Sequence, residues 1–136
     1  MSKGNTFEND LMLKVFQATE FSWDANTNLY ISLHTADPGE GGSQTTSEAA
    51  YGSYARQTVA RDATGWDVSG NQASNDDLIQ FPQCTSGSET LTHFAVGTAV
   101  SGTGQILYSG ALSSSLAVSS GIQPQFAANT LVVTED

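Results

Sequence analysis

The sequence predicts an all-β fold, mainly an antiparallel β-sandwich, a jelly roll or an open barrel, with one α-helix near the N-terminus. From residue 29 onward, short segments of alternating apolar and polar residues recur about every ten residues, with Gly and Ser between them. Before residue 28, apolar residues recur with a helical period instead. The 136 residues suffice for one core, so we expect a single domain, with a helical segment over about 1–28 and a β body over 29–136.

Residues 5–19 have the only convincing helical pattern. Six apolar residues form one helical stripe and its widened edge: Phe7, Leu11, Met12, Val15, Phe16 and Ala18. Asn5 is expected to cap the helix, with Glu8 completing a capping box. The apolar stripe must be covered, and two partners are open at this point: the chain's own sheet, or a neighbouring subunit.

The strands follow from the alternation of the sequence. Leu29, Ile31 and Leu33 alternate with more polar residues, which is typical of a half-buried strand. Further strands are predicted at 54–61, 66–69, 72–75, 78–81, 91–97, 106–109, 116–118, 122–127 and 130–134. Gly70 and Asn71 predict a tight hairpin between two of these strands.

Two loops are also predicted from turn-forming residues. The segment from Asp37 to Ala49 is rich in Gly, Ser and Thr, which predicts a long exposed connection. Gly102 and Gly104 indicate a second hairpin connection near residues 101–104.

The charge of the chain excludes several classes of partner. Fourteen Asp and Glu stand against four Lys and Arg, which gives a formal net charge of −10. Binding to phosphates needs clustered Lys and Arg, so we expect neither a nucleic acid nor a membrane as partner. A lone cysteine, Cys84, and the lack of a signal-like or membrane-spanning segment predict a soluble protein made in a cytoplasm.

Motifs of known chemistry are not found, so we expect no catalytic residue, no cofactor and no metal. His34 and His93 are the only histidines, and a metal site using both would need further ligands from distant strands. Acidic turns around Asp62, Asp67 and Asp76 could bind calcium but lack the spacing of a calcium loop. Aromatic residues among the strands leave sugar stacking open as an alternative to a core role.

Several segments together resemble a known family. They are Leu29–Gly39, Tyr54–Arg56, Phe81–Pro82, Thr92–Phe94, Leu107–Leu112, Phe126–Ala128 and Leu131–Thr134. Their order and spacing resemble small tailed-phage virion proteins that are often labelled tail fibre proteins, some of which look like capsid decoration or cement proteins. The resemblance implies a structural role in the virion, with synthesis in the host bacterial cytoplasm and no catalytic residue to carry over.

Within this family we expect a decoration protein on the outer head surface, because a fibre normally needs length and axial repetition and this sequence shows neither. It would be a homotrimer that bridges copies of the major capsid protein, because symmetric closure lets several weak contacts act together. The candidate contacts come from the helix and from the loop after the first long strand: Phe7, Leu11, Val15, Phe16, Asp37, Pro38 and Glu40. The alternatives are a tail fibre or tail-associated protein that binds glycans, and a small hydrolase with paired carboxylates.

Overall fold

The computed structural model describes residues 1–136 and contains one helix and ten strands. The elements in chain order are β1 (Ser2–Lys3), α1 (Asn5–Gln17), β2 (Asn28–His34), β3 (Gln57–Ala60), β4 (Trp66–Ser69), β5 (Gln72–Asn75), β6 (Ile79–Gln80), β7 (Glu89–Gly97), β8 (Ile106–Val118), β9 (Gln125–Phe126) and β10 (Val132–Thr134). The predicted all-β class with one N-terminal helix is therefore confirmed.

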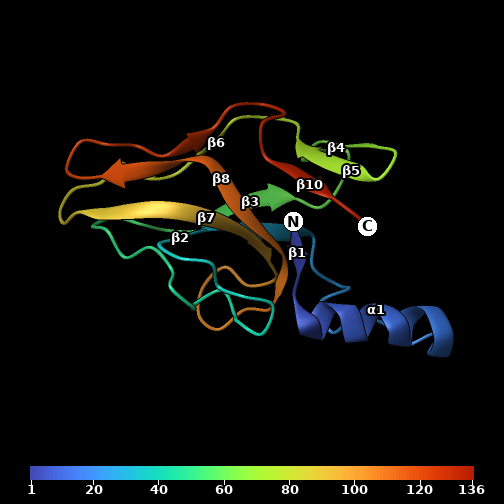
Figure 1. Ribbon diagram of the computed structural model, residues 1–136. Helices are drawn as coiled ribbons and strands as arrows, with labels where there is room; N and C mark the ends of the chain where they lie inside the picture. The colour runs from blue at the N-terminus through green and yellow to red at the C-terminus, as the bar shows by residue number, and fades with distance from the viewer.

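All the strands pair in an antiparallel manner, in three sheets. The main sheet has five strands in the order β1-β8-β7-β2-β3. A three-stranded sheet, β10-β5-β4, and a two-stranded sheet, β6-β9, lie on one side of it in Figure 1. The arrangement is a layered β body in which a large sheet is covered by two small ones.

The apolar core lies on one face of the main sheet. Alternation along β2 points Ile31 and Leu33 to this face, where both side chains are almost fully buried. Phe81, Leu91 and Phe94 pack into the same cluster, and so does the free Cys84. Cys84 therefore behaves as a small buried apolar residue of the core.

The opposite face of β2 carries a buried polar layer. Ser32 and His34 are fully buried there, and Nδ1 of His34 lies 2.8 Å from the carbonyl oxygen of Thr46. Nδ1 must donate to this carbonyl, so Nε2 accepts from the Ser32 hydroxyl at 2.8 Å. Gln44, also fully buried, binds the N–H of Ala99. The loop from Asp37 to Ala49 thus covers the sheet, and the prediction of an exposed connection is correct only for part of it.

Acidification is expected to weaken the fold through His34. Burial lowers the pKa of His34 and outweighs the hydrogen bond to Thr46 and the charge of Glu48, which raise it, while Arg56 and His93 lower it further. In the unfolded chain His34 takes up a proton near pH 6.5, whereas the buried ring of the folded chain remains neutral to lower pH. The free energy of unfolding is therefore unaffected by His34 above about pH 6.5 and decreases as the pH falls below it. The loss can reach about 1.4 kcal/mol per pH unit.

Urea unfolding at several pH values between about 7.5 and 5.5 tests this expectation, because carboxylates with lowered pKa titrate below that window. The His34→Gln variant is the control and should show a clearly smaller pH dependence. Equal pH dependence in both proteins would contradict the assignment.

The apolar anchor of the helix on the body lies in its first turns. Phe7 is buried against Trp23 and Leu107, and its ring lies 5.4 Å from that of Tyr108 in an edge-on arrangement. The N-cap is Gly4 and no side chain caps the helix, so the predicted capping by Asn5 is wrong. The N–H of Asn5 instead donates to the carbonyl oxygen of Glu40 at 2.8 Å, which ties the helix to the β2–β3 loop.

The predicted strand positions are largely confirmed. The hairpin of β4 and β5 has the predicted bounds, with Gly70 at a positive φ of 60° as such a tight turn requires. Two predicted strands, 106–109 and 116–118, are parts of the single long strand β8, because β7 pairs with both of them. The short strand β1 was not predicted, since two residues carry no alternation.

Candidate interaction site

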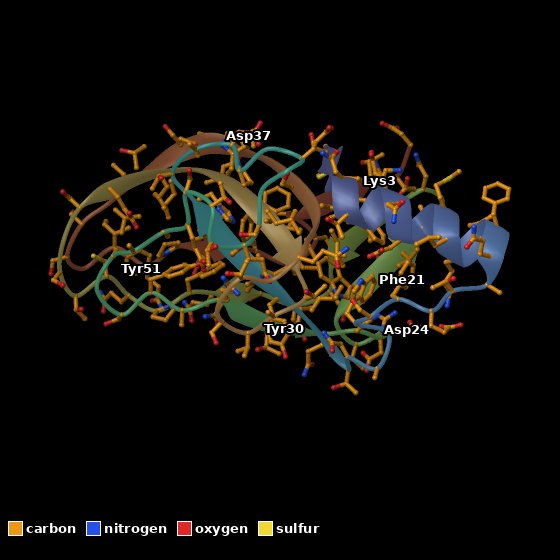
Figure 2. The ribbon with its side chains drawn as sticks, turned by 90° about the horizontal axis from the view of Figure 1, so that it is seen from below. Lys3, Phe21, Asp24, Tyr30, Asp37 and Tyr51 are labelled. Carbon is orange, nitrogen blue, oxygen red and sulfur yellow. The ribbon has the colours of Figure 1, made fainter.

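The second half of α1 carries an exposed apolar patch, the helix tip, which consists of Met12, Val15 and Phe16. These side chains are 58%, 66% and 73% exposed. Residues three and four positions apart share one face of a helix, so the three form a continuous patch. Figures 1 and 2 show this half of the helix extending beyond the β body. The tip is therefore an arm whose apolar face the chain itself does not cover.

An ion pair holds the arm in place on another side of the helix. Nζ of Lys14 lies 2.5 Å from a carboxylate oxygen of Glu20 and 3.3 Å from one of Asp24. These carboxylates follow α1 in the chain, and Lys14 also lies over the ring of Phe21 at 5.2 Å from its centroid. Because the pairs are exposed, each is expected to contribute little to stability, but together they orient the helix.

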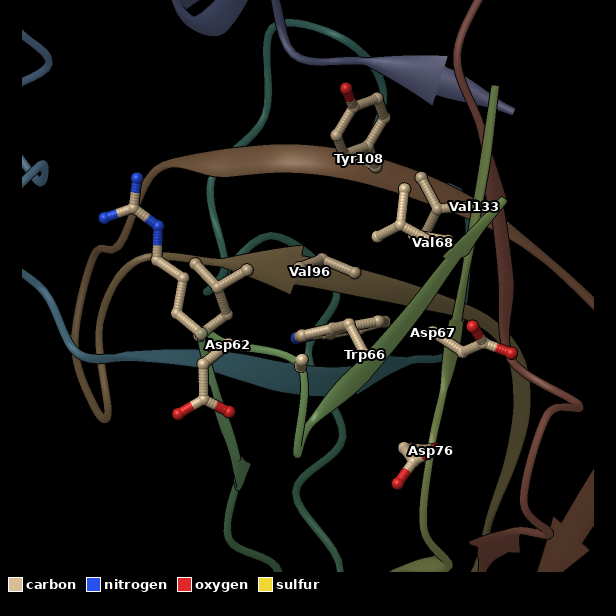
Figure 3. Close-up of a pocket in the computed structure, with 12 residues that line it drawn as sticks. Asp62, Trp66, Asp67, Val68, Asp76, Val96, Tyr108 and Val133 are labelled. Carbon is tan, nitrogen blue, oxygen red and sulfur yellow. The ribbon is translucent and has the colours of Figure 1, made fainter. Parts of the chain in front are cut away.

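An apolar pocket of about 570 Å³, the sheet pocket, lies where the three-stranded sheet stands beside the main sheet. Its apolar lining comes from both sheets and the β3–β4 loop: Leu29, Ala63, Trp66, Val68, Ala73, Val96, Tyr108 and Val133. Figure 3 shows Val68 and Val133 side by side and Trp66 between the two sheets. Alternation along β4 points Trp66 and Val68 to the pocket, and Val68 remains 70% exposed.

The rim of the sheet pocket is acidic. Asp62, Asp67 and Asp76 stand around it, and Figure 3 shows their carboxylates directed away from the pocket. None of the three forms an ion pair within the chain. Hydrogen bonds from Thr64 hold the pKa of Asp62 below its ordinary value, so this carboxylate stays charged. An apolar occupant without negative charge suits such a site best.

The only cation among the residues that line the pocket, Arg61, is already engaged. The guanidinium of Arg61 lies 3.1 Å from a carboxylate oxygen of Asp24 and 4.7 Å from the centroid of the Trp23 ring. It also donates to the backbone carbonyls of Asp24 and Asn26. Arg61 therefore stabilises the segment that follows α1, and its charge is not available to neutralise the carboxylates of the pocket rim.

The structure separates the residues that the sequence predicted as partner contacts. Phe7 and Pro38 are buried within the chain, and Leu11 is half-buried. Val15 and Phe16 are exposed on the helix tip, and Asp37 and Glu40 are exposed on the β2–β3 loop. The exposed candidates thus form two separate surface groups: Val15 and Phe16, and Asp37 and Glu40.

The sheet pocket was not predicted, because its lining comes from positions between residues 29 and 133. One signal was available in the sequence. Trp66 and Val68 alternate with polar residues in a short hairpin strand, which indicates that one face of this strand meets apolar surroundings.

The two histidines lie opposite each other in the main sheet, but the ring of each is hydrogen-bonded to neighbouring Ser or Thr groups. His34 and His93 are paired across β2 and β7 in the main sheet. The His34 ring bonds to Ser32 and Thr46, and Nδ1 of His93 lies 2.8 Å from the Thr92 hydroxyl. No group of three or more His, Cys, Asp or Glu side chains is placed to hold a metal ion. The single helix, of 13 residues, is too short to span a lipid bilayer.

Comparison with known proteins identifies the family to which the chain belongs. The family model described as podophage GP4 fiber I protein gp80 matches residues 2–134, which is nearly the whole chain. No curated protein matches the chain significantly. The match includes α1, the three sheets and the loops between them. The chain therefore belongs to the family of the podophage GP4 fiber I protein gp80, and it is a structural protein of the tailed-phage virion.

Proposed function

We propose that this chain is a structural subunit of a podophage fibre, which assembles with other virion proteins through its exposed apolar surface. The family match over residues 2–134 is the observation that carries the proposal, because the family is described as a fibre protein. The structure adds a physical reason for assembly. A helix arm that leaves Phe16 73% exposed gains stability when another protein surface covers it.

The role of such a subunit is mechanical and needs no chemical step. Residues with the properties of partner contacts are available on the helix tip and on the loop that carries Asp37 and Glu40. The rest of the surface is acidic, with a net charge of −10 for the chain, and favours a partner with a complementary basic patch. We infer that the chain acts without catalysis, cofactor or metal.

A second candidate is a decoration protein on the capsid, and the shape of the chain favours it. A fibre that reaches a receptor normally has axial length and repetition, whereas this chain folds as one layered β body without an internal repeat. In this alternative the chain would form a homotrimer on the major capsid protein, with the loop around Asp37 and Glu40 as a contact.

Copy number and labelling distinguish the two candidates. A fibre subunit is expected in a small number of copies for each particle, whereas a decoration protein occupies the many equivalent sites of the head. Quantitative mass spectrometry of purified particles gives the copy number, and immunogold labelling gives the position. Label at the tail end with a low copy number supports the fibre proposal, and label over the head with hundreds of copies would replace it by the capsid alternative.

A further inference from the structure

We propose that the helix tip of one copy of this chain docks into the sheet pocket of a second copy. The inference rests on the proposed assembly role and names the partner of the exposed helix. In the single chain the apolar tip with Phe16 is not covered, and the pocket beside Trp66 and Val68 is not filled. The proposed contact would cover the first and fill the second.

The two surfaces match in chemistry and size. The tip presents an aromatic, an aliphatic and a thioether side chain from one helix face. The pocket has walls of valine, leucine, tyrosine and tryptophan, and its volume of about 570 Å³ has room for more than one side chain.

Charge also favours a second copy at this place. Copies with a net charge of −10 repel one another over most of their surface, so a contact must form where acidic groups do not face acidic groups. Residues 11–19 contain no acid, and their one charged residue, Lys14, is paired with Glu20 and Asp24. The rim of the pocket carries Asp62, Asp67 and Asp76 without ion pairs. The helix tip can therefore approach the acidic rim of the pocket without repulsion between carboxylates.

The geometry requires the contact to form between copies. Phe7 fixes the start of α1 on the main sheet, and Lys14 holds the helix to Glu20 and Asp24. From this anchored start the helix extends away from the β body, so the helix tip lies beyond it (Figure 1). Tip and pocket are different surfaces of one chain, so the contact is head-to-tail. Such contacts close into a ring, of which a trimer is one case, or continue as a filament.

Sedimentation analysis of the full chain and of three variants tests the proposal. Phe16→Asp places a charge on the tip, Val68→Asp places one on the pocket wall, and Val100→Asp is the matched control at another exposed valine. All three side chains are exposed, so the fold should persist, which circular dichroism and the urea midpoint verify. We expect the unchanged chain and Val100→Asp to be oligomeric, and the other two to associate about thirtyfold more weakly or not at all.

Mixing the two defective variants gives the sharper result. Phe16→Asp keeps an intact pocket and Val68→Asp keeps an intact tip, so a mixture can form one complete contact. We expect a complex of two chains, one of each variant, although neither variant associates alone. The proposal is overturned if the unchanged chain is a monomer at every concentration, if either charged variant associates like the control, or if the mixture stays monomeric. Each of these results leaves the position of the protein on the particle untouched.

Discussion

Replacing Glu48 by glutamine is expected to lower the free energy of unfolding by about 3 kcal/mol or more, because it leaves a buried cation without its counter-charge. The side chain of Arg56 is only 3% exposed. Its Nε and Nη2 donate to the two carboxylate oxygens of Glu48 at 2.8 and 2.7 Å. Nη1 donates to the carbonyl oxygen of Ala99, and Nη2 also donates to that of Gly102. The ion pair thus joins two parts of the β2–β3 loop, and the hydrogen bonds of Arg56 to Ala99 and Gly102 connect this loop to the β7–β8 loop.

A double-mutant cycle measured by urea unfolding tests this account. The variants are Glu48→Gln, Arg56→Met and the combination of both. The double variant has no buried charge, so its loss should be smaller than the sum of the two single losses by more than about 1 kcal/mol. Additive losses would show that the two side chains contribute independently, against the contact described above.

Replacing Phe81 by alanine is expected to lower the free energy of unfolding by about 3–5 kcal/mol, through lost apolar contacts and the cavity left behind. Phe81 is fully buried. Its ring lies 6.3 Å from that of Tyr54 in a stacked arrangement and 6.3 Å from that of Phe126 in an edge-on arrangement. These contacts join three parts of the chain in one cluster: the β2–β3 loop, strand β9, and the segment that follows β6.

Urea unfolding also measures this effect, and two variants serve as controls. Phe81→Leu retains most of the volume and should lose clearly less than the alanine variant. Val100→Ala changes an exposed side chain and should stay within about 0.5 kcal/mol of the unchanged protein. If Phe81→Ala lost no more than Val100→Ala, the core described here would be wrong.

The parts of the fold that local sequence signals determine were predicted well. Gly70 and Asn71 fixed both ends of the β4–β5 hairpin, because a two-residue turn leaves no freedom in the register. The helix was also found, since its period differs from that of the strands. The capping of the helix was not predicted correctly. The N–H of Asn5 donates to the carbonyl oxygen of Glu40, which lies 35 positions away in the sequence, and no local pattern reveals such a partner.

The candidate site was predictable only in part, for a similar reason. The apolar stripe with Val15 and Phe16 is visible in the sequence, but which part of it stays exposed depends on where Phe7 anchors the helix. The β2–β3 loop illustrates the same limit. Its polar composition predicts exposure, yet Gln44 is fully buried, and its side-chain oxygen accepts a hydrogen bond from the backbone N–H of Ala99 in the β7–β8 loop.

A cryo-electron microscopy reconstruction of the intact particle tests the central proposal most directly. The β body and the arm of α1 are distinctive enough in shape to be placed in density at side-chain resolution. We predict density for this chain in the fibre, with neighbouring copies related by a contact in which Phe16 of one copy lies against Trp66 and Val68 of the next. Density for the chain only on the capsid lattice would contradict the fibre proposal.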